Sequence, residues 1–143
     1  MTENLVICIG NVSRGDDGAA HLVAALLEAR LPASVRLLTA PQLDIDMADE
    51  AAEADSVVLV DAERRHGPPV EVRSVEAAPH GEYGHALEPG HLLDIAWALY
   101  SARPRMTLVT LAAPEMEHGE GLSPTAEEAA REAAEVVLRL LEA

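Results

Sequence analysis

The chain has 143 residues and a formal net charge of −15 at pH 7, with ten arginines and no lysine against 25 acidic residues. A charge of this sign and size argues against binding to nucleic acid or to an anionic membrane. No apolar stretch reaches the roughly 18 residues of a membrane span, and the first residues lack the basic region of a signal peptide. We therefore expect one domain over residues 1–143, cytoplasmic and monomeric.

The first half of the chain alternates short apolar runs with helical patterns, which is typical of a sheet that carries helices on both faces. The run 5–9 is continuously apolar, as expected for a strand covered on both sides, and a periodic helix is predicted over 19–30. A second strand over 35–39, a helical stretch over about 43–54 and a third strand over 56–60 follow.

The second half continues this alternation. Residues 70–75 alternate apolar and charged side chains, which predicts a half-exposed strand at an edge of the sheet. A helix is expected from about residue 88 or 89 to 101, with Trp97 as a packing residue and with an inward face of Leu92, Leu93, Ala96, Leu99 and Tyr100. A fifth strand over 106–111 and a last helix, N-capped by Ser123 with Pro124 at its first position, complete the chain. The predicted fold is α/β, a three-layer α/β/α sandwich with a mostly parallel five-stranded twisted sheet.

Three acidic residues lie at the ends of predicted strands. Asp16 and Asp17 fall in the segment 10–18, between the first strand and the helix after it, and Asp61 directly follows the third strand. Parallel strands end at one rim of the sheet, and ligands of open α/β sheets bind in the crevice beyond those ends. These side chains are therefore candidates for a common site.

The parts of several familiar catalytic sites are missing. The sequence contains no Gly-x-Ser-x-Gly elbow and no His-Glu-x-x-His motif, and its glycines after the first strand are spaced wrongly for a dinucleotide-binding loop. The one cysteine, Cys8, lies inside the first strand and is expected to be a buried structural thiol. Carboxylate and imidazole ligands remain. Asp17, Asp61 and His85, the last from a loop rich in glycine and histidine, would offer a divalent metal, nickel or zinc, a mixed set with open positions.

Structural roles are the alternatives for the same residues. Asp16 can cap the helix that follows or interact with its dipole, and Asp61 can be an ordinary turn residue. The histidines other than His85 are expected to be structural or exposed: His21, His66, His80, His91 and His118.

A series of short motifs extends over nearly the whole chain. It begins with the Gly-Asn pair at 10–11, Gly-Asp-Asp-Gly at 15–18 and Val-Asp-Ala at 60–62. It continues in Gly-His-Ala-Leu at 84–87, followed by Leu92-Leu93, and in Gly-Leu-Ser-Pro at 121–124. In their order and spacing, these motifs resemble those of the [NiFe]-hydrogenase maturation proteases.

The resemblance implies a small α/β/α endopeptidase that removes a C-terminal extension from the precursor of a [NiFe]-hydrogenase large subunit, here called the client, after nickel has been inserted. The nickel belongs to the client, and the family's ligands to it correspond to Asp17, Asp61 and His85. Many members carry a paired glycine after the second strand, where this chain has Thr-Ala-Pro-Gln-Leu at 39–43.

Two roles of the client's nickel stay open. It can act as a Lewis acid that also activates a water molecule, or it can only position the bond while Asp16 or Asp17 serves as general base.

Two other classes of protein also match part of the pattern. A phosphoacceptor receiver domain likewise places acids after its first and third strands, but it needs a lysine after the last strand, where this chain has Ala112-Ala113. A noncatalytic nickel-binding chaperone would use the same three ligands as the peptidase.

Overall fold

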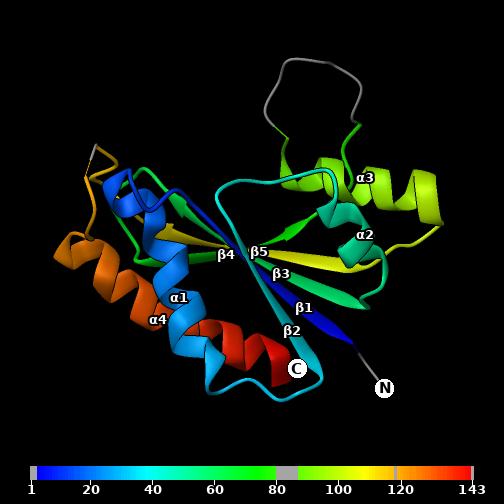
Figure 1. The fold of residues 1–143 in the computed structure, drawn as a ribbon, viewed down its shortest axis with the longest axis horizontal. Helices are drawn as coiled ribbons and strands as arrows, with labels where there is room; N and C mark the ends of the chain where they lie inside the picture. The colour runs from blue at the N-terminus through cyan, green and yellow to red at the C-terminus, as the bar shows by residue number, and fades with distance from the viewer. Residues whose placement is uncertain (1–2, 80–86, 118, 143) are drawn as a thin grey trace.

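The structure, a computed structural model, describes residues 3–79, 87–117 and 119–142, and its centre is a five-stranded sheet (Figure 1). The strands follow the spatial order β2-β1-β3-β5-β4. All neighbouring strands are parallel except β4, which pairs antiparallel with β5 at one edge. Their bounds are β1 Asn4–Ile9, β2 Val35–Ala40, β3 Ser56–Glu63, β4 Val70–Val75 and β5 Arg105–Ala112. The edge position predicted for residues 70–75 is confirmed.

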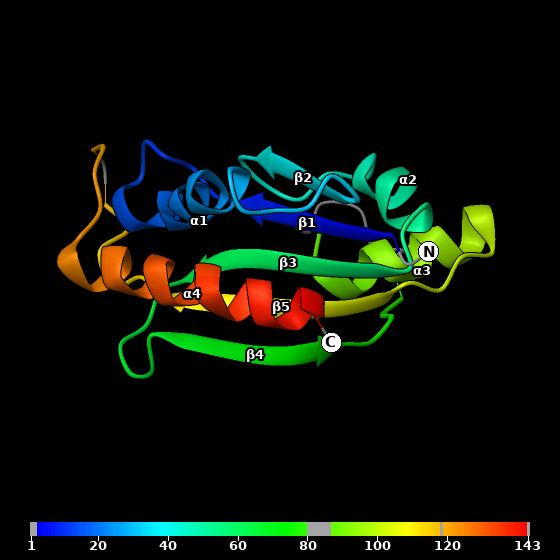
Figure 2. The same cartoon turned by 90° about the horizontal axis from the view of Figure 1, so that it is seen from below.

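Helices cover both faces of the sheet, which confirms the predicted three-layer α/β/α fold. Helices α1 and α4 pack together on one face, and α2 and α3 lie on the other (Figures 1 and 2). The helices are the 3₁₀-helix η1 Gly15–Gly18 and the α-helices α1 Ala19–Glu28, α2 Met47–Ala52, α3 Pro89–Tyr100 and α4 Pro124–Glu142. Within the described ranges, no helix has the length and apolar character needed to span a membrane.

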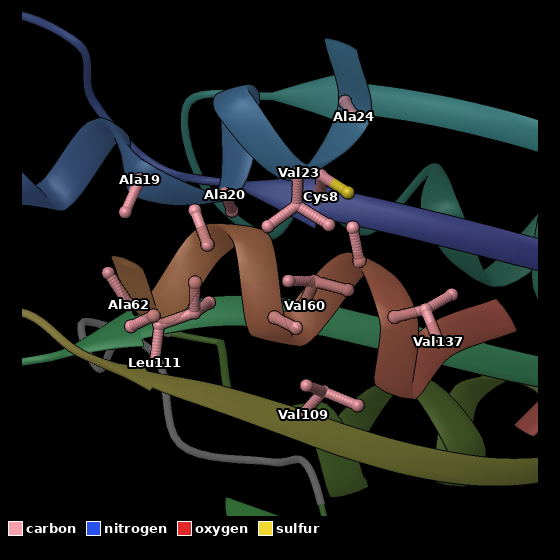
Figure 3. Close-up of a cluster of buried hydrophobic side chains, with 14 of the residues drawn as sticks. Cys8, Ala19, Ala20, Val23, Ala24, Val60, Ala62, Val109, Leu111 and Val137 are labelled. Atoms are coloured by element: carbon pink, nitrogen blue, oxygen red, sulfur yellow. The ribbon is translucent and has the colours of Figure 1, made fainter. Parts of the chain in front are cut away.

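The side chains of β1 and β3 alternate between two cores, which is why both strands are apolar throughout. Val6, Cys8, Val58 and Val60 point into the core under α1 and α4, shown in Figure 3. Leu5, Ile7, Val57 and Leu59 point into the core under α2 and α3. Cys8 is a buried thiol, as predicted, and its burial raises its pKa to about 12.

Helix α2 is shorter than the predicted stretch 43–54. The backbone N–H of Asp46 donates a hydrogen bond of 2.8 Å to the Asp44 carboxylate. Such a bond two residues along the chain stabilises a turn and competes with helical hydrogen bonding. The helix therefore begins only at Met47.

The end of α3 differs from the prediction that Leu99, Tyr100 and Trp97 face the core. These side chains are 66%, 49% and 45% exposed. The buried face of the helix ends at Ala96, one turn before the helix itself. Beyond it the Tyr100 hydroxyl donates to the Asp49 carboxylate of α2, and the Arg103 guanidinium lies 3.7 Å from the centre of the Trp97 ring. These rings make polar and cation–π contacts instead of filling a core.

Candidate active-site cleft

A cleft lies at the carboxyl ends of β1 and β3, the rim at which the sequence predicted a site. Its walls come from the turns after β1 and β2, from β3 and from the start of α3. The cleft is lined by Ile9, Gly10, Asn11, Arg14, Asp17, Pro41, Gln42, Leu43, Asp61, Leu87, Glu88 and Pro89.

Asp61 lies within β3 and not after it, because the strand continues to Glu63. It pairs with Ile9 of β1 and with Thr110 of β5. The alternation along a strand puts its side chain on the same face as Leu59, the face that α2 and α3 cover. This alternation directs the carboxyl group toward the start of α3 and into the cleft.

Asp17 reaches the cleft from η1, on a tight turn after β1. One oxygen of its carboxylate accepts a hydrogen bond of 3.0 Å from the backbone N–H of Asn11. The backbones of Gly10 and Asp17 approach so closely that a Cβ added at Gly10 would lie 1.9 Å from the carbonyl oxygen of Asp17. The Nε2 atom of His21 donates to the Gly10 carbonyl at 2.7 Å, which fixes the same turn from the side of α1. His21 therefore has the structural role expected for it.

The two cleft carboxylates interact electrostatically. The pKa of Asp61 is raised to about 7, mainly by burial and also by the negative charge of Asp17, against a hydrogen bond from the backbone of Ala62 that lowers it. Two carboxylates that repel each other and are partly removed from water are stabilised by a cation bound between them. A pair of carboxylate oxygens is also a suitable part of a divalent metal site. The residues present therefore fit the binding of a metal ion.

Asp16, the other acid of the pair, faces away from this cleft and is only 1% exposed. One carboxylate oxygen accepts a hydrogen bond of 2.7 Å from the backbone N–H of Ser123. The other accepts from the Ser123 hydroxyl at 2.7 Å and from the backbone N–H of Glu115 at 2.9 Å. The Ser123 hydroxyl in turn accepts from the N–H of Ala126, which confirms Ser123 as the N-cap of α4. Asp16 therefore has a structural role, but not the predicted one: neither η1 nor α1 has a side-chain cap, and the Asp16 carboxylate binds the start of α4 and the loop before it.

Backbone hydrogen bonds join the same two segments. Gly15 donates to the Gly119 carbonyl at 2.7 Å, and Gly119 donates to the Ser13 carbonyl at 3.0 Å. Asp16 donates to the Glu115 carbonyl at 2.9 Å. The turn that carries Asp17 is thus docked against the loop before α4. No sequence pattern indicated this contact, because it joins segments about a hundred residues apart.

His85 lies outside the described residues, so its place in the ligand set stays a prediction, and His80 and His118 lie outside them as well. His91 is structural, as expected: its Nδ1 atom accepts a hydrogen bond of 2.9 Å from the backbone N–H of Glu88 at the start of α3. Among residues 3–79, 87–117 and 119–142, no group of three or more His, Cys, Asp and Glu side chains can hold a metal ion. Of the three predicted metal ligands, the described residues therefore contain two, the carboxylates of Asp17 and Asp61.

Comparison with known proteins gives matches among solved structures. No protein-family model and no curated protein matches the sequence. The hydrogenase maturating endopeptidase HybD from E. coli superimposes with a TM-score of 0.78 at 23% identity, over 98% of this chain and 92% of that one. The [NiFe] hydrogenase maturation protease HycI from Thermococcus kodakarensis KOD1 superimposes with a TM-score of 0.77 at 24% identity, over 99% of this chain and 94% of that one. A hydrogenase 2 maturation peptidase from a Thaumarchaeota archaeon superimposes with a TM-score of 0.72 at 22% identity, over 97% of both chains.

These superpositions extend over nearly the whole length of both partners in each pair. At identities below 25% they establish the architecture. The chain therefore has the fold of the [NiFe]-hydrogenase maturation proteases, the family that its sequence motifs resemble.

Proposed function

We propose that this chain is an endopeptidase that removes the C-terminal extension of a [NiFe]-hydrogenase large-subunit precursor after nickel has been inserted. The observation that carries the proposal is the pair Asp17 and Asp61 in one cleft at the carboxyl ends of β1 and β3. The fold and the sequence motifs support it, because structures described as hydrogenase maturation endopeptidases share the architecture. The cytoplasmic location and the monomeric state expected from the sequence stay predictions.

In this proposal the nickel ion arrives as part of the client. Asp17 and Asp61 bind it through carboxylate oxygens, and His85 is the third ligand predicted from the sequence. Because the pKa of Asp61 is about 7 in the free chain, binding of the cation displaces a proton that this group partly holds at neutral pH. A client without nickel leaves two mutually repelling carboxylates in the cleft uncompensated. The requirement for nickel therefore acts as a checkpoint before cleavage.

Hydrolysis of a peptide bond needs an activated water molecule and a proton for the departing amine. The client's nickel can polarise the carbonyl or the water, as divalent metals do in other hydrolases. Of the two acids that the sequence offers as general base, Asp17 is the better placed, because it lines the cleft. Asp16 is buried beside the cleft, and both its oxygens already accept hydrogen bonds.

Two observations disfavour the receiver domain. Flavodoxin-like receivers have the parallel strand order 2-1-3-4-5. Here β5 lies between β3 and β4, and β4 runs antiparallel at the edge. The sequence also contains no lysine to bind a phosphoryl group. The nickel-binding chaperone would use the same cleft, so only a measurement of cleavage separates it from the peptidase.

The test is the intact mass of a nickel-loaded large-subunit precursor, isolated from a strain of the source organism that lacks this chain, before and after incubation with it. The peptidase is expected to release one C-terminal peptide from the nickel-loaded precursor and to leave the nickel-free precursor intact. Stable binding without loss of mass would identify a chaperone. Incorporation of phosphate from acetyl phosphate and magnesium, without loss of mass, would identify a receiver.

A further inference from the structure

The cleft contains one basic side chain among its described residues, that of Arg14. The other charged residues that line it are Asp17, Asp61 and Glu88, all acidic. The chain has 25 acidic residues and only ten arginines, so its composition does not account for the presence of an arginine in an acidic cleft.

No hydrogen bond or ion pair within the described ranges engages the guanidinium group of Arg14. Most other arginines have a partner. Arg30, Arg36, Arg65 and Arg131 pair with glutamates, Arg64 donates to the Met116 carbonyl, and Arg103 lies on the Trp97 ring. Arg14 is solvent-exposed at the lining of the cleft, and its donors are available to a ligand.

The backbone of Arg14 is held on both sides. Its N–H donates to the Asn11 carbonyl at 3.1 Å, and its carbonyl accepts from the N–H of Asp17 at 3.1 Å. It also forms an isolated parallel bridge with Gly119. The backbone of Arg14 is therefore held on the turn that positions Asp17, and its side chain starts from a defined point beside that acid.

We propose that Arg14 is a specificity-determining residue that binds a carboxylate of the client next to the bond to be cut. This inference rests on the proposed function. A guanidinium group presents its N–H donors in a planar fork that matches a carboxylate in two parallel hydrogen bonds. Among the described residues that line the cleft, the other charged groups are acidic and repel a carboxylate, so a carboxylate is expected to bind at Arg14. Binding there sets the register of the client segment relative to Asp17 and Asp61.

The experiment measures steady-state cleavage of the nickel-loaded precursor by wild-type chain and by the variants Arg14→Gln and Arg14→Lys. The matched control is Arg73→Gln, an exposed arginine on β4 outside the cleft. Arg14→Gln is expected to raise KM on the order of tenfold, the effect of losing a charge-assisted hydrogen-bonded pair, with kcat little changed. Arg14→Lys keeps the charge but loses the planar pair of guanidinium donors, so its KM should lie between those of wild type and Arg14→Gln. Arg73→Gln should match wild type.

A second arm identifies the carboxylate. Acidic residues of the precursor on either side of the cut are changed one at a time to the corresponding amide and tested against wild type and Arg14→Gln. One client variant should reproduce the rise in KM with wild-type chain and show no further rise with Arg14→Gln, since the two changes remove the same interaction. Additive effects for every client acid would overturn the inference.

Other results also decide. An Arg14→Gln variant with lowered kcat and unchanged KM would overturn the inference, because Arg14 would then act on the reacting carbonyl group. Equality of Arg14→Gln and Arg73→Gln would overturn it as well. Calorimetric titration of the precursor separates the inference from the proposed function. Binding without cleavage that weakens in Arg14→Gln, with the same non-additivity, would refute the peptidase but keep Arg14 as the group that binds a carboxylate of the client. Absence of both cleavage and binding would refute both.

Discussion

Asp16 and Ser123 are joined by two hydrogen bonds of 2.7 Å, although 107 positions separate them in the sequence. The first comes from the backbone N–H of Ser123 and the second from its hydroxyl group. They tie the turn that carries Asp17 to the first turn of α4. Asp16 and Asp17 thus have different surroundings. Asp16 is buried and hydrogen-bonded to Ser123 and Glu115, a set of contacts here called the clamp, whereas Asp17 lines the cleft.

We expect Asp16→Ala to lower the free energy of unfolding by about 3 kcal/mol, because three partly buried donors, two of Ser123 and one of Glu115, lose a charged acceptor. Urea denaturation followed by circular dichroism measures the change. The control is Asp55→Ala, which removes one exposed hydrogen bond from the backbone of Glu3 and should cost less than about 1 kcal/mol. Equal losses in the two variants would show that the clamp is not a special source of stability.

Asp17→Asn, Asp61→Asn and His85→Gln should each reduce processing of the nickel-loaded precursor by at least about 100-fold, as expected when a group that acts on the reacting atoms is removed. The folds should stay intact, since these changes keep the shape of each side chain. The measurement is the rate of C-terminal peptide release by mass spectrometry, with thermal unfolding as the check on folding. Glu63→Gln, an exposed change two residues further along β3, should remain active. Normal cleavage by His85→Gln would remove this histidine from the site.

The stability of the metal-free chain should depend on the protonation of Asp61. Its pKa is about 7 in the folded state against 3.8 ordinarily, so between these values the folded state holds a proton that the unfolded state has released. The contribution to stability is therefore full below about pH 4 and is lost as the pH rises to about 7. The shift corresponds to at most about 4 kcal/mol, and less in practice because the carboxyl group keeps some contact with water.

Asp61→Asn removes this titration. In urea denaturation with a chelator present, wild type should become less stable than the variant as the pH rises from 5 to 8. The difference between the two proteins isolates Asp61 from the many other carboxylates. An identical pH dependence for both would contradict the raised pKa.

Gly10→Ala should disturb the cleft, because the new Cβ would lie 1.9 Å from the carbonyl oxygen of Asp17 and η1 would have to move. We expect a loss of about 2 to 3 kcal/mol in unfolding free energy together with a lower cleavage rate at temperatures where the variant is folded. Gly67→Ala is the control. Its backbone is also left-handed, with φ at +97°, but nothing lies within 4 Å of an added Cβ, so it should lose only about 1 to 2 kcal/mol and keep its activity.

Local sequence patterns are sufficient to predict which segments form strands and helices and which rim of the sheet holds the acids. The continuous apolar run of β1 reflects the cover on both of its faces, and this information is local. The alternation in β4 does not match its burial, because residues 71–74 are all exposed, Val72 included. The rule that parallel strands end at one rim then brought Asp17 and Asp61 together without coordinates.

The contacts between segments distant in the chain could not be predicted from such patterns and are seen in the folded structure. Asp16 and Asp17 are equivalent in the sequence, and the loop before α4, docked on one side of their turn, gives them different roles. The outward position of Tyr100 likewise depends on where the core under α3 ends. Local patterns encode burial, since burial repeats with the period of a strand or helix. Contacts across a hundred residues depend on where loops close, and no single segment carries that information.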